Sequence, residues 1–224
     1  MQAAELLARL NPTTVRYDIG RGGIPELTAQ DIAAAVAMVP AGIGRDLMCL
    51  LHWPDQVAVT RRSIDRALMD VQFKEWTRRE LAMYRALMAV ACDEDVMGRS
   101  TLTRQYSDAN AQRWPKLHAS IESPDIAEPW ALLRAAVLEE IRYPKGCGEC
   151  QGTGNIRRRD GECSCTRCLG SGKVRYGTTW RAARLKMKES SFNQRWIGPY
   201  EWLYDFMAQE LQRAEHEFVK AVRR

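Results

Sequence analysis

The stretch Cys147-Gly-Glu-Cys-Gln-Gly-Thr-Gly154 is followed, after a short spacer, by Cys165-Thr-Arg-Cys-Leu-Gly-Ser-Gly172. The unit Cys-x-x-Cys-x-Gly-x-Gly therefore occurs twice. Each Cys-x-x-Cys turn directs two sulfurs to one point, and two such turns supply the four thiolates of a closed tetrahedral Zn²⁺ site. Because no position is left for water, the predicted site is structural and not catalytic. Its ligands are Cys147, Cys150, Cys165 and Cys168.

The remaining residues of this stretch bear on the site in different ways. The glycines after each cysteine pair suit a backbone that wraps closely around the sulfurs, because only Gly adopts φ > 0 without penalty. Cys163 offers a third sulfur near Cys165, either as a spare thiol or as an alternate ligand. We interpret it as a spare thiol, because Cys165 alone keeps the two-residue spacing to Cys168.

Cysteine usage and composition limit the class of protein. Seven cysteines, five of them between 147 and 168, indicate metal binding in a reducing compartment more than a secreted disulfide framework. The N-terminus lacks the features of a signal peptide, and the longest weakly polar run, 32–44, is too short to span a bilayer. With 224 residues, 46% of them hydrophobic, the chain can form one core and a small additional module. We expect a globular protein of the cytoplasm without a membrane segment.

Basic residues are concentrated around the cysteines. Between Lys145 and Lys188 there are eleven Lys and Arg against three acidic residues, a local charge of +8 in a chain whose total is +5. Four thiolates on one Zn²⁺ return about two negative charges, so the segment stays basic. This asymmetry indicates a polyanionic partner such as nucleic acid. Solubilising surface charge is the alternative interpretation.

Periodicity and chain breaks predict a mainly α fold: a helical bundle with a helix-turn-helix-like segment and a small inserted β-hairpin zinc module. The expected order is a flexible segment at 1–26, a helical domain at 27–144 and the zinc module at 145–176. In the last part, 177–224, the helix-turn-helix-like segment precedes a long amphipathic helix that packs on the helical domain. Separate helices are expected over 28–39, 42–51, 55–71, 75–93, 100–113 and 129–142, and the zinc hairpin over 157–159 and 173–176.

The helix at 75–93 has an apolar stripe that is typical of a core face. Its members are Leu81, Tyr84, Leu87, Met88 and Ala91.

The segment after the zinc module predicts two short helices. The first, 178–187, places Arg181, Arg184 and Lys188 on one side, where they could contact phosphates. A turn at 189–191 leads to a second helix that ends at Gly198-Pro199. Its outward residues Asn193, Gln194 and Arg195 carry amide and guanidinium groups suited to base edges. The pattern indicates a helix-turn-helix, or equally two packed helices with polar exteriors.

The two Cys-Gly units, together with Tyr176, Arg181-Ala-Ala, Trp196, Pro199 and Leu203-Tyr-Asp205, resemble the lambda-type phage late antitermination protein Q family. The resemblance is strongest over 147–210, and a weaker similarity covers about 31–70. The region 75–128 departs from the family pattern.

The resemblance implies a DNA-binding transcription antitermination factor that loads onto paused RNA polymerase at a phage late promoter and suppresses termination. Its partners would be double-stranded DNA and bacterial RNA polymerase, contacted through the β flap and the sigma factor, in the cytoplasm of the host. The resemblance implies one structural Zn²⁺ on the four cysteines and no catalysis, and we find no nucleophile–base pair, P-loop or carboxylate dyad. The expected DNA-facing residues are Arg157, Arg158, Arg159, Lys173, Arg175, Arg181, Arg184, Lys186, Lys188, Asn193, Gln194 and Arg195.

Two other functions remain open at the level of the sequence. DnaJ-type chaperones use the same Cys-x-x-Cys-x-Gly-x-Gly unit, but they carry four units and a His-Pro-Asp tripeptide. This chain has two units, and its nearest match, His52-Trp-Pro-Asp55, is interrupted. A conventional promoter-binding regulator is the third hypothesis.

Overall fold

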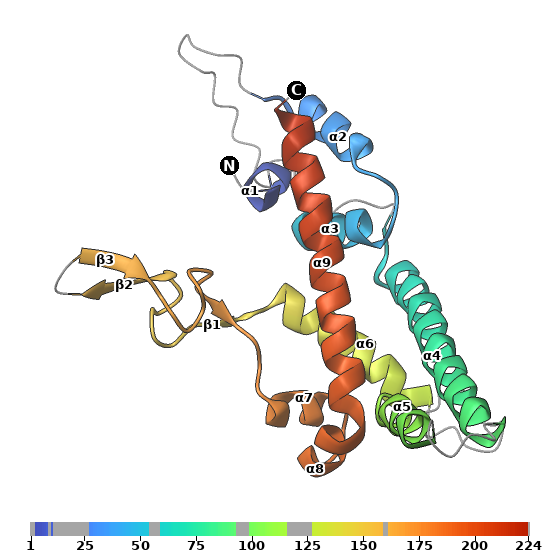
Figure 1. The fold of residues 1–224 in the computed structure, drawn as a ribbon. Coiled ribbons are helices and arrows are strands. Elements are labelled where there is room, and N and C mark those ends of the chain that lie inside the picture. Colours follow the sequence, from blue (N-terminus) through green and yellow to red (C-terminus); the bar gives the residue numbers. More distant parts are fainter. Residues whose placement is uncertain are drawn as a thin grey trace, which may run out of the picture. The chain divides into compact units, whose positions relative to one another are not determined.

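The computed structural model describes residues 3–8, 10, 27–53, 59–92, 99–115, 127–158 and 161–223 (Figure 1). It is mainly helical and carries two small antiparallel sheets and a cysteine cluster, which confirms the predicted fold class. The chain divides into two compact units, Met1–Val71 with Tyr204–Arg224, and Gln72–Leu203. Both boundaries lie inside helices, α4 (Arg61–Cys92) and α9 (Ile197–Val222), and so differ from the boundaries expected from the sequence. None of the described helices is long and apolar enough to cross a membrane.

The first unit is built from α1 (Ala3–Ala8), α2 (Ala29–Met38), α3 (Ile43–His52), the first part of α4 up to Val71 and the last part of α9 from Tyr204. A capping box starts α2: the Thr28 hydroxyl accepts from the Asp31 amide at 3.2 Å, and the Asp31 carboxylate accepts from the Thr28 amide at 2.9 Å. These bonds to Thr28 lower the pKa of Asp31. The core of this unit contains Ala3, Leu6, Leu7, Ile32, Ala35, Val39, Met48, Cys49, Ala214 and Phe218.

Two features of the first unit were not evident from the sequence. Leu6 and Leu7 are fully buried, so α1 belongs to the core and is not part of a flexible segment. Residues 11–26 of that predicted segment lie outside the described residues. Gly44 lets α3 approach α9 closely, because a Cβ there would lie 2.3 Å from the Glu210 carbonyl oxygen. The ring of His52 pairs with Glu215 at 2.9 Å across the same contact.

The second unit contains the rest of α4, then α5 (Arg99–Ala111), α6 (Ala127–Arg142), α7 (Thr178–Arg184) and the start of α9. The helices predicted at 55–71 and 75–93 are parts of the single helix α4, because no residue between them interrupts helical backbone. All five members of the predicted core stripe on α4 are exposed: Leu81, Tyr84, Leu87, Met88 and Ala91. The stripe prediction was wrong because α4 turns a different face to its unit, with Gln72, Glu80 and Met83 buried.

Aromatic side chains fill the centre of the second unit. Trp130 makes edge contacts with Trp196 at 5.1 Å between ring centroids, and Trp114 contacts Trp202 at 5.1 Å. Trp114 and Trp130 lie 5.8 Å apart and join the two pairs. These rings connect the end of α5 with α6 and the turn that opens α9, so three segments distant in sequence share one core.

The helix–turn–helix path is present, but its turn and its end differ from the prediction. The turn is Leu185–Lys188, and Glu189–Ser191 (α8) already forms the first helical turn after it. The π-helical segment η2 (Phe192–Trp196) follows and continues without a break into α9. Gly198 and Pro199 therefore do not end the helix. A proline is tolerated in the first turn of an α-helix, and the π segment just before it loosens the i−4 contacts that a proline ring would meet.

The strands pair differently from the predicted hairpin. β2 (Asn155–Arg158) pairs with β3 (Gly161–Ser164), with Ile156 opposite Cys163. β1 (Lys145–Gly146) pairs with β4 (Lys173–Val174). The expected pairing of 157–159 with 173–176 does not occur, because each strand that leaves a cysteine unit pairs with the strand that enters the other one.

Candidate metal centre and the residues around it

The four predicted ligands form one cluster in the second unit. The sulfurs of Cys147, Cys150, Cys165 and Cys168 lie within 4.8 Å of one another, and all four residues are buried. The Sγ–Sγ distances are 3.8 Å between Cys147 and Cys165 and 3.7 Å between Cys150 and Cys168. A tetrahedral site with metal–sulfur bonds of about 2.3 Å requires sulfurs about 3.8 Å apart, whereas a disulfide requires about 2.05 Å. The cluster therefore has the geometry of a Cys₄ metal site.

Each cysteine unit folds into the same turn. The amide of Gly152 donates to the Cys147 carbonyl at 3.1 Å, and the amide of Gly170 donates to the Cys165 carbonyl at 3.2 Å. In each unit, one further amide donates to the sulfur of the second cysteine. The amide of Gly154 donates to Cys150 and that of Gly172 donates to Cys168, both at 3.3 Å. Amide donors of this kind stabilise thiolates, as metal ligation requires.

The two units interlock through their last glycines. The amide of Cys147 donates to the Gly172 carbonyl at 2.8 Å, and the amide of Cys165 donates to the Gly154 carbonyl at 2.7 Å. A Cβ on Gly154 would lie 2.2 Å from the Gly170 carbonyl oxygen, and one on Gly172 would lie 2.2 Å from the Gly152 carbonyl oxygen. Both glycines also have positive φ, +81° and +71°. The repeat thus needs glycine at these positions for close backbone approach as well as for conformation.

The thiols of the cluster differ in acidity. Burial tends to raise the pKa of Cys150, but the hydrogen bonds from the Gly154 amide and from neighbouring sulfurs outweigh it and lower that pKa to about 7. Burial raises the pKa of Cys165 to about 11. A divalent cation among four sulfurs favours the thiolate form at every ligand, so metal binding and deprotonation are linked.

Cys163 lies outside this cluster. It is partly buried on β3, and its thiol donates to the Ile156 carbonyl at 3.5 Å. The metal-capable group found among the described residues consists of the other four cysteines. This position agrees with the interpretation of Cys163 as a spare thiol.

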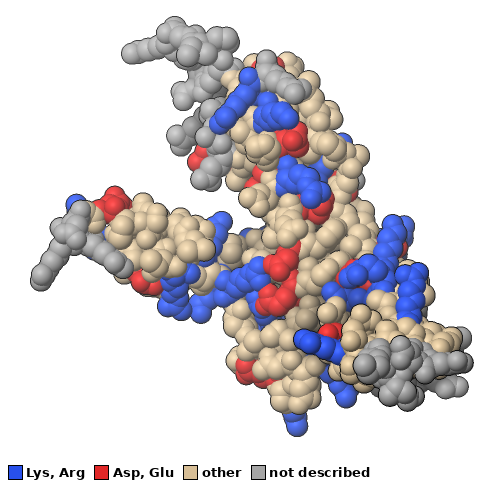
Figure 2. Space-filling model, viewed as in Figure 1, with Lys and Arg blue, Asp and Glu red and all other residues tan. Residues whose placement is uncertain are grey.

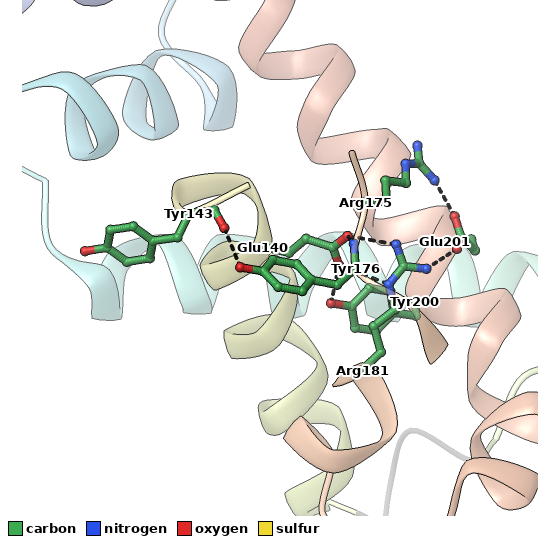
Figure 3. Close-up of polar contacts among 7 residues, drawn as sticks. All are labelled: Glu140, Tyr143, Arg175, Tyr176, Arg181, Tyr200 and Glu201. Atoms are coloured by element: carbon green, nitrogen blue, oxygen red, sulfur yellow. Dashed lines mark hydrogen bonds and ion pairs between the residues drawn. The ribbon is translucent and has the colours of Figure 1, made fainter. Parts of the chain in front are cut away.

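A buried carboxylate connects the module to the helices (Figure 3). Glu140, near the end of α6, is 1% exposed and accepts from the Tyr176 amide at 2.9 Å, just after β4. The Tyr176 hydroxyl donates to the Tyr143 carbonyl at 3.0 Å. Arg175 pairs with Glu201 on α9. The chain leaving the metal module is therefore held by α6 and by the first turns of α9.

Arg181 is the centre of this network and is not available to DNA. Its side chain is 4% exposed and forms a two-bond pair with Glu140 at 3.0 and 2.8 Å, together with a contact to Glu201. The Tyr200 hydroxyl donates to Glu140 at 2.8 Å, and the Tyr200 ring lies below the guanidinium. Burial would lower the pKa of Arg181, but the hydrogen bonds and charge of Glu140 outweigh it and raise that pKa. The prediction that Arg181 faces a phosphate was wrong, because helical spacing does not reveal a partner 41 residues away.

The other predicted DNA-facing residues lie in several environments. The exposed ones are Arg157, Lys173, Arg175, Arg184, Lys186, Lys188, Asn193, Gln194 and Arg195. Three of these are paired with acids: Arg175 with Glu201, Arg184 with Glu139 at 2.5 Å, and Lys186 with Glu128 at 2.7 Å. Arg158 belongs to β2, and its side chain, like all of Arg159, lies outside the described residues. Figure 2 shows Lys and Arg side chains gathered around β1 and β4, with acidic side chains nearby.

Sequence reasoning missed Glu140 and Tyr200 as organising residues. A signal for Glu140 was present, because it continues the spacing of the buried residues Leu133, Ala136 and Val137 on α6. A carboxylate on the apolar face of a helix requires a partner. For Tyr200 no signal in the sequence distinguished a hydrogen-bonded buried phenol from an ordinary core aromatic residue.

No family model, curated protein or solved structure matches this chain. The fold and the cluster define a mainly helical protein with a four-cysteine metal module. The relation to the antitermination family remains a prediction from the motifs. A functional proposal therefore depends on the cysteine module and on the polar residues around it.

Proposed function

We propose that this protein is a zinc-containing, DNA-binding transcription antitermination factor that acts on RNA polymerase paused at a phage late promoter. The observation that carries the proposal is the cysteine module with exposed cations around it and along the segment that follows. Residues 145–188 contain eleven basic and three acidic residues. The motif resemblance over 147–210 selects antitermination from among the DNA-binding functions.

Zinc is the metal that best fits the donor set. Four thiolates in a tetrahedral arrangement are typical of structural Zn²⁺ or of iron–sulfur proteins, and the paired Cys-x-x-Cys spacing favours zinc. Cys147, Cys150, Cys165 and Cys168 would hold it, and it would supply folding free energy to the module without taking part in any reaction. The four sulfurs would bind the ion, and the amides of Gly154 and Gly172, which donate to two of these sulfurs, would stabilise them as thiolates.

The role of the surrounding residues in this proposal is binding. Exposed Arg157, Lys173 and Lys188 would neutralise phosphates, and the salt dependence of such contacts comes from counterion release. Arg175, Arg184 and Lys186 are also exposed, but each would exchange an intramolecular carboxylate for a phosphate. The Glu140–Arg181 network would keep the segment between β4 and α7 in one conformation during binding. By family resemblance, the β flap and sigma factor of the bacterial polymerase would be the protein partners, in the host cytoplasm.

A second candidate function is favoured by one observation. Large apolar side chains are exposed along α4, including Phe73, Leu81, Tyr84 and Met88. Such a surface suits binding of unfolded chains, as in the DnaJ-type hypothesis. Suppression of aggregation of a denatured test protein, lost on replacing these side chains with Ser, would favour this function over antitermination.

The deciding experiment is a purified transcription assay with a terminator downstream of the promoter. We expect read-through when the template carries the cognate late promoter, and none with an unrelated promoter. More initiation without read-through would identify a conventional promoter-binding regulator instead. Duplex DNA affinity should also fall steeply with salt, and an affinity independent of salt would contradict every DNA-binding function proposed here.

A further inference from the structure

A cavity of about 1130 Å³ lies within the second unit. Its wall is formed by Arg79 of α4, by the end of α5 and the residues after it, by Pro129 of α6, and by the junction of η2 and α9. This volume lies slightly above the range of about 300–1,000 Å³ that is typical of small-molecule sites. Gln194 and Arg195, predicted from the sequence to contact base edges, are among the lining residues.

The lining is polar, cationic and partly aromatic. None of the described residues that line the cavity is acidic, and three are arginines: Arg79, Arg113 and Arg195. Amide side chains come from Asn110, Gln112 and Gln194, and indole rings come from Trp114 and Trp196. Cations, amides and indoles together are the groups with which proteins bind nucleotides, through phosphates, base edges and base faces.

Two of the arginines are held in place by acids that do not line the cavity. Glu75 accepts from Arg79 at 2.8 Å, and Arg79 also donates to the Gln112 carbonyl at 3.0 Å and stacks on Trp114 at 4.5 Å. Glu80 accepts two bonds from Arg113 at 2.7 and 3.0 Å. Arg195, by contrast, is exposed and makes no hydrogen bond or ion pair with any described residue. It is the lining cation that a ligand can engage without breaking a described ion pair.

The position of Gln194 and Arg195 on a cavity wall determines which form of nucleic acid they can contact. A duplex presents its base edges in a groove that an element of the protein must enter. Side chains on the wall of a hollow instead reach a base that has left the stack, or one in a single strand. An unpaired base reaches such a wall at the least cost, because it does not have to be extruded from a base stack.

We propose that this cavity binds an unpaired nucleotide of a nucleic-acid strand. Gln194 contacts the hydrogen-bonding edge of the base, and Arg195 contacts the adjacent phosphate, both from exposed positions. Trp114 and Trp196 are largely buried and form the inner wall of the cavity. This inference rests on the proposed function and deepens it, because it assigns to the polar face of η2 a single-stranded element rather than an intact duplex.

The test compares single strands and duplex on the full zinc-loaded chain. Fluorescein-labelled oligonucleotides of about 12 nucleotides, a length that covers a typical single-strand site, are used as single-stranded DNA, as single-stranded RNA and as duplex DNA. Binding is followed by anisotropy and by quenching of tryptophan fluorescence, because two indoles line the cavity. Arg195→Ala is compared with Lys188→Ala, which removes the same charge from an exposed position that does not line the cavity.

We expect Arg195→Ala to weaken single-strand binding about tenfold or more, because it removes a charge-assisted contact with the phosphate. Lys188→Ala should weaken it less, and the two variants should affect duplex binding equally. Quenching should accompany single-strand binding and be reduced in Arg195→Ala. Gln194→Glu, which adds a carboxylate to the wall, should also weaken single-strand binding. It provides a second test that leaves Arg195 intact.

The other outcomes separate this inference from the proposed function. Equal losses for Arg195→Ala on single strands and duplex would overturn the cavity site while leaving DNA binding in place. Binding to no nucleic acid at all would contradict the proposed function itself. Displacement of the single strand by poly-glutamate at equal charge concentration would show an anion site without base recognition and overturn the inference. Preference for the DNA or the RNA strand would identify the source of the nucleotide, and either preference supports the site.

Discussion

The metal module and the helical part of the second unit are stabilised by different means. In the module, the four cysteines form the buried cluster, and Ile156 and Val174 are the described hydrophobic residues packed against it. In the helical part, Trp130, Phe192 and Tyr200 are buried, and an ion pair between Glu140 and Arg181 lies among them. We therefore expect the module to take its free energy of folding from a metal bound by the four cysteines, and the helices to take theirs from apolar burial and one polar network.

The largest effect on the module is expected from the loss of one of the four cysteines of the cluster. We expect Cys150→Ser to abolish stoichiometric zinc binding and to unfold 145–176, because structural zinc contributes about 10–16 kcal/mol in small modules. The helices should stay folded, since their cores contain none of the four sulfurs. Zinc content by atomic absorption and amide protection by hydrogen exchange would measure both effects.

Cys163→Ser is the matched control for this prediction. It also removes one sulfur from the module, but from a residue outside the four-sulfur cluster. It should keep full zinc content and normal amide protection. Loss of zinc in Cys163→Ser, or retention of zinc in Cys150→Ser, would contradict the ligand set.

The difference between the two regions also explains what the sequence could predict. The clustering of the four cysteines and the need for glycines beside them could be predicted from spacing, because the chemistry of each Cys-x-x-Cys turn is local. The strand pairing did not, because it depends on how the two units interlock through Gly154 and Gly172. Features that depend on neighbouring residues could therefore be predicted from the sequence, whereas contacts between distant segments could not.

The helical errors have the same cause. Periodicity predicted an apolar core face on the part of α4 that belongs to the second unit, but Leu81 and Met88 on that face are exposed. Arg181 looked like a surface cation until Glu140 and Glu201 were seen to be close in space. Gln194 and Arg195 were correctly placed as exposed, yet the cavity beside them is formed by α5 and α6 as well, which no local pattern encodes.

An intermediate effect is expected in the helical part from Glu140→Gln. This change leaves Arg181, which is 4% exposed, without its principal counter-charge. Loss of one partner from a buried pair costs about 3–5 kcal/mol, and the remaining contact with Glu201 places the effect near the lower limit. Urea unfolding monitored by tryptophan fluorescence should show the loss.

The zinc affinity of Glu140→Gln tests whether the module and the helices are stabilised independently. Because Glu140 accepts from Tyr176 outside the four-sulfur cluster, Glu140→Gln should leave zinc affinity within about twofold of wild type. Competition with a chromophoric chelator would measure it. A large fall in zinc affinity would show that the module and the helices form one energetic unit, against the comparison drawn above.

The smallest effect on stability is expected from Glu139→Gln, one residue before Glu140. Glu139 pairs with Arg184 at 2.5 Å, but the two side chains are 33% and 48% exposed. Exposed pairs contribute about 0–1 kcal/mol, so unfolding in urea should change by less than about 1 kcal/mol. Under the proposed function the same change releases Arg184 for phosphate, and duplex DNA affinity should rise about two- to fivefold at low salt, with a steeper dependence on salt concentration. Reduced DNA affinity in Glu139→Gln would show that the ion pair positions Arg184 for binding, and that the acidic residues beside the module support the cationic surface instead of competing with DNA for it.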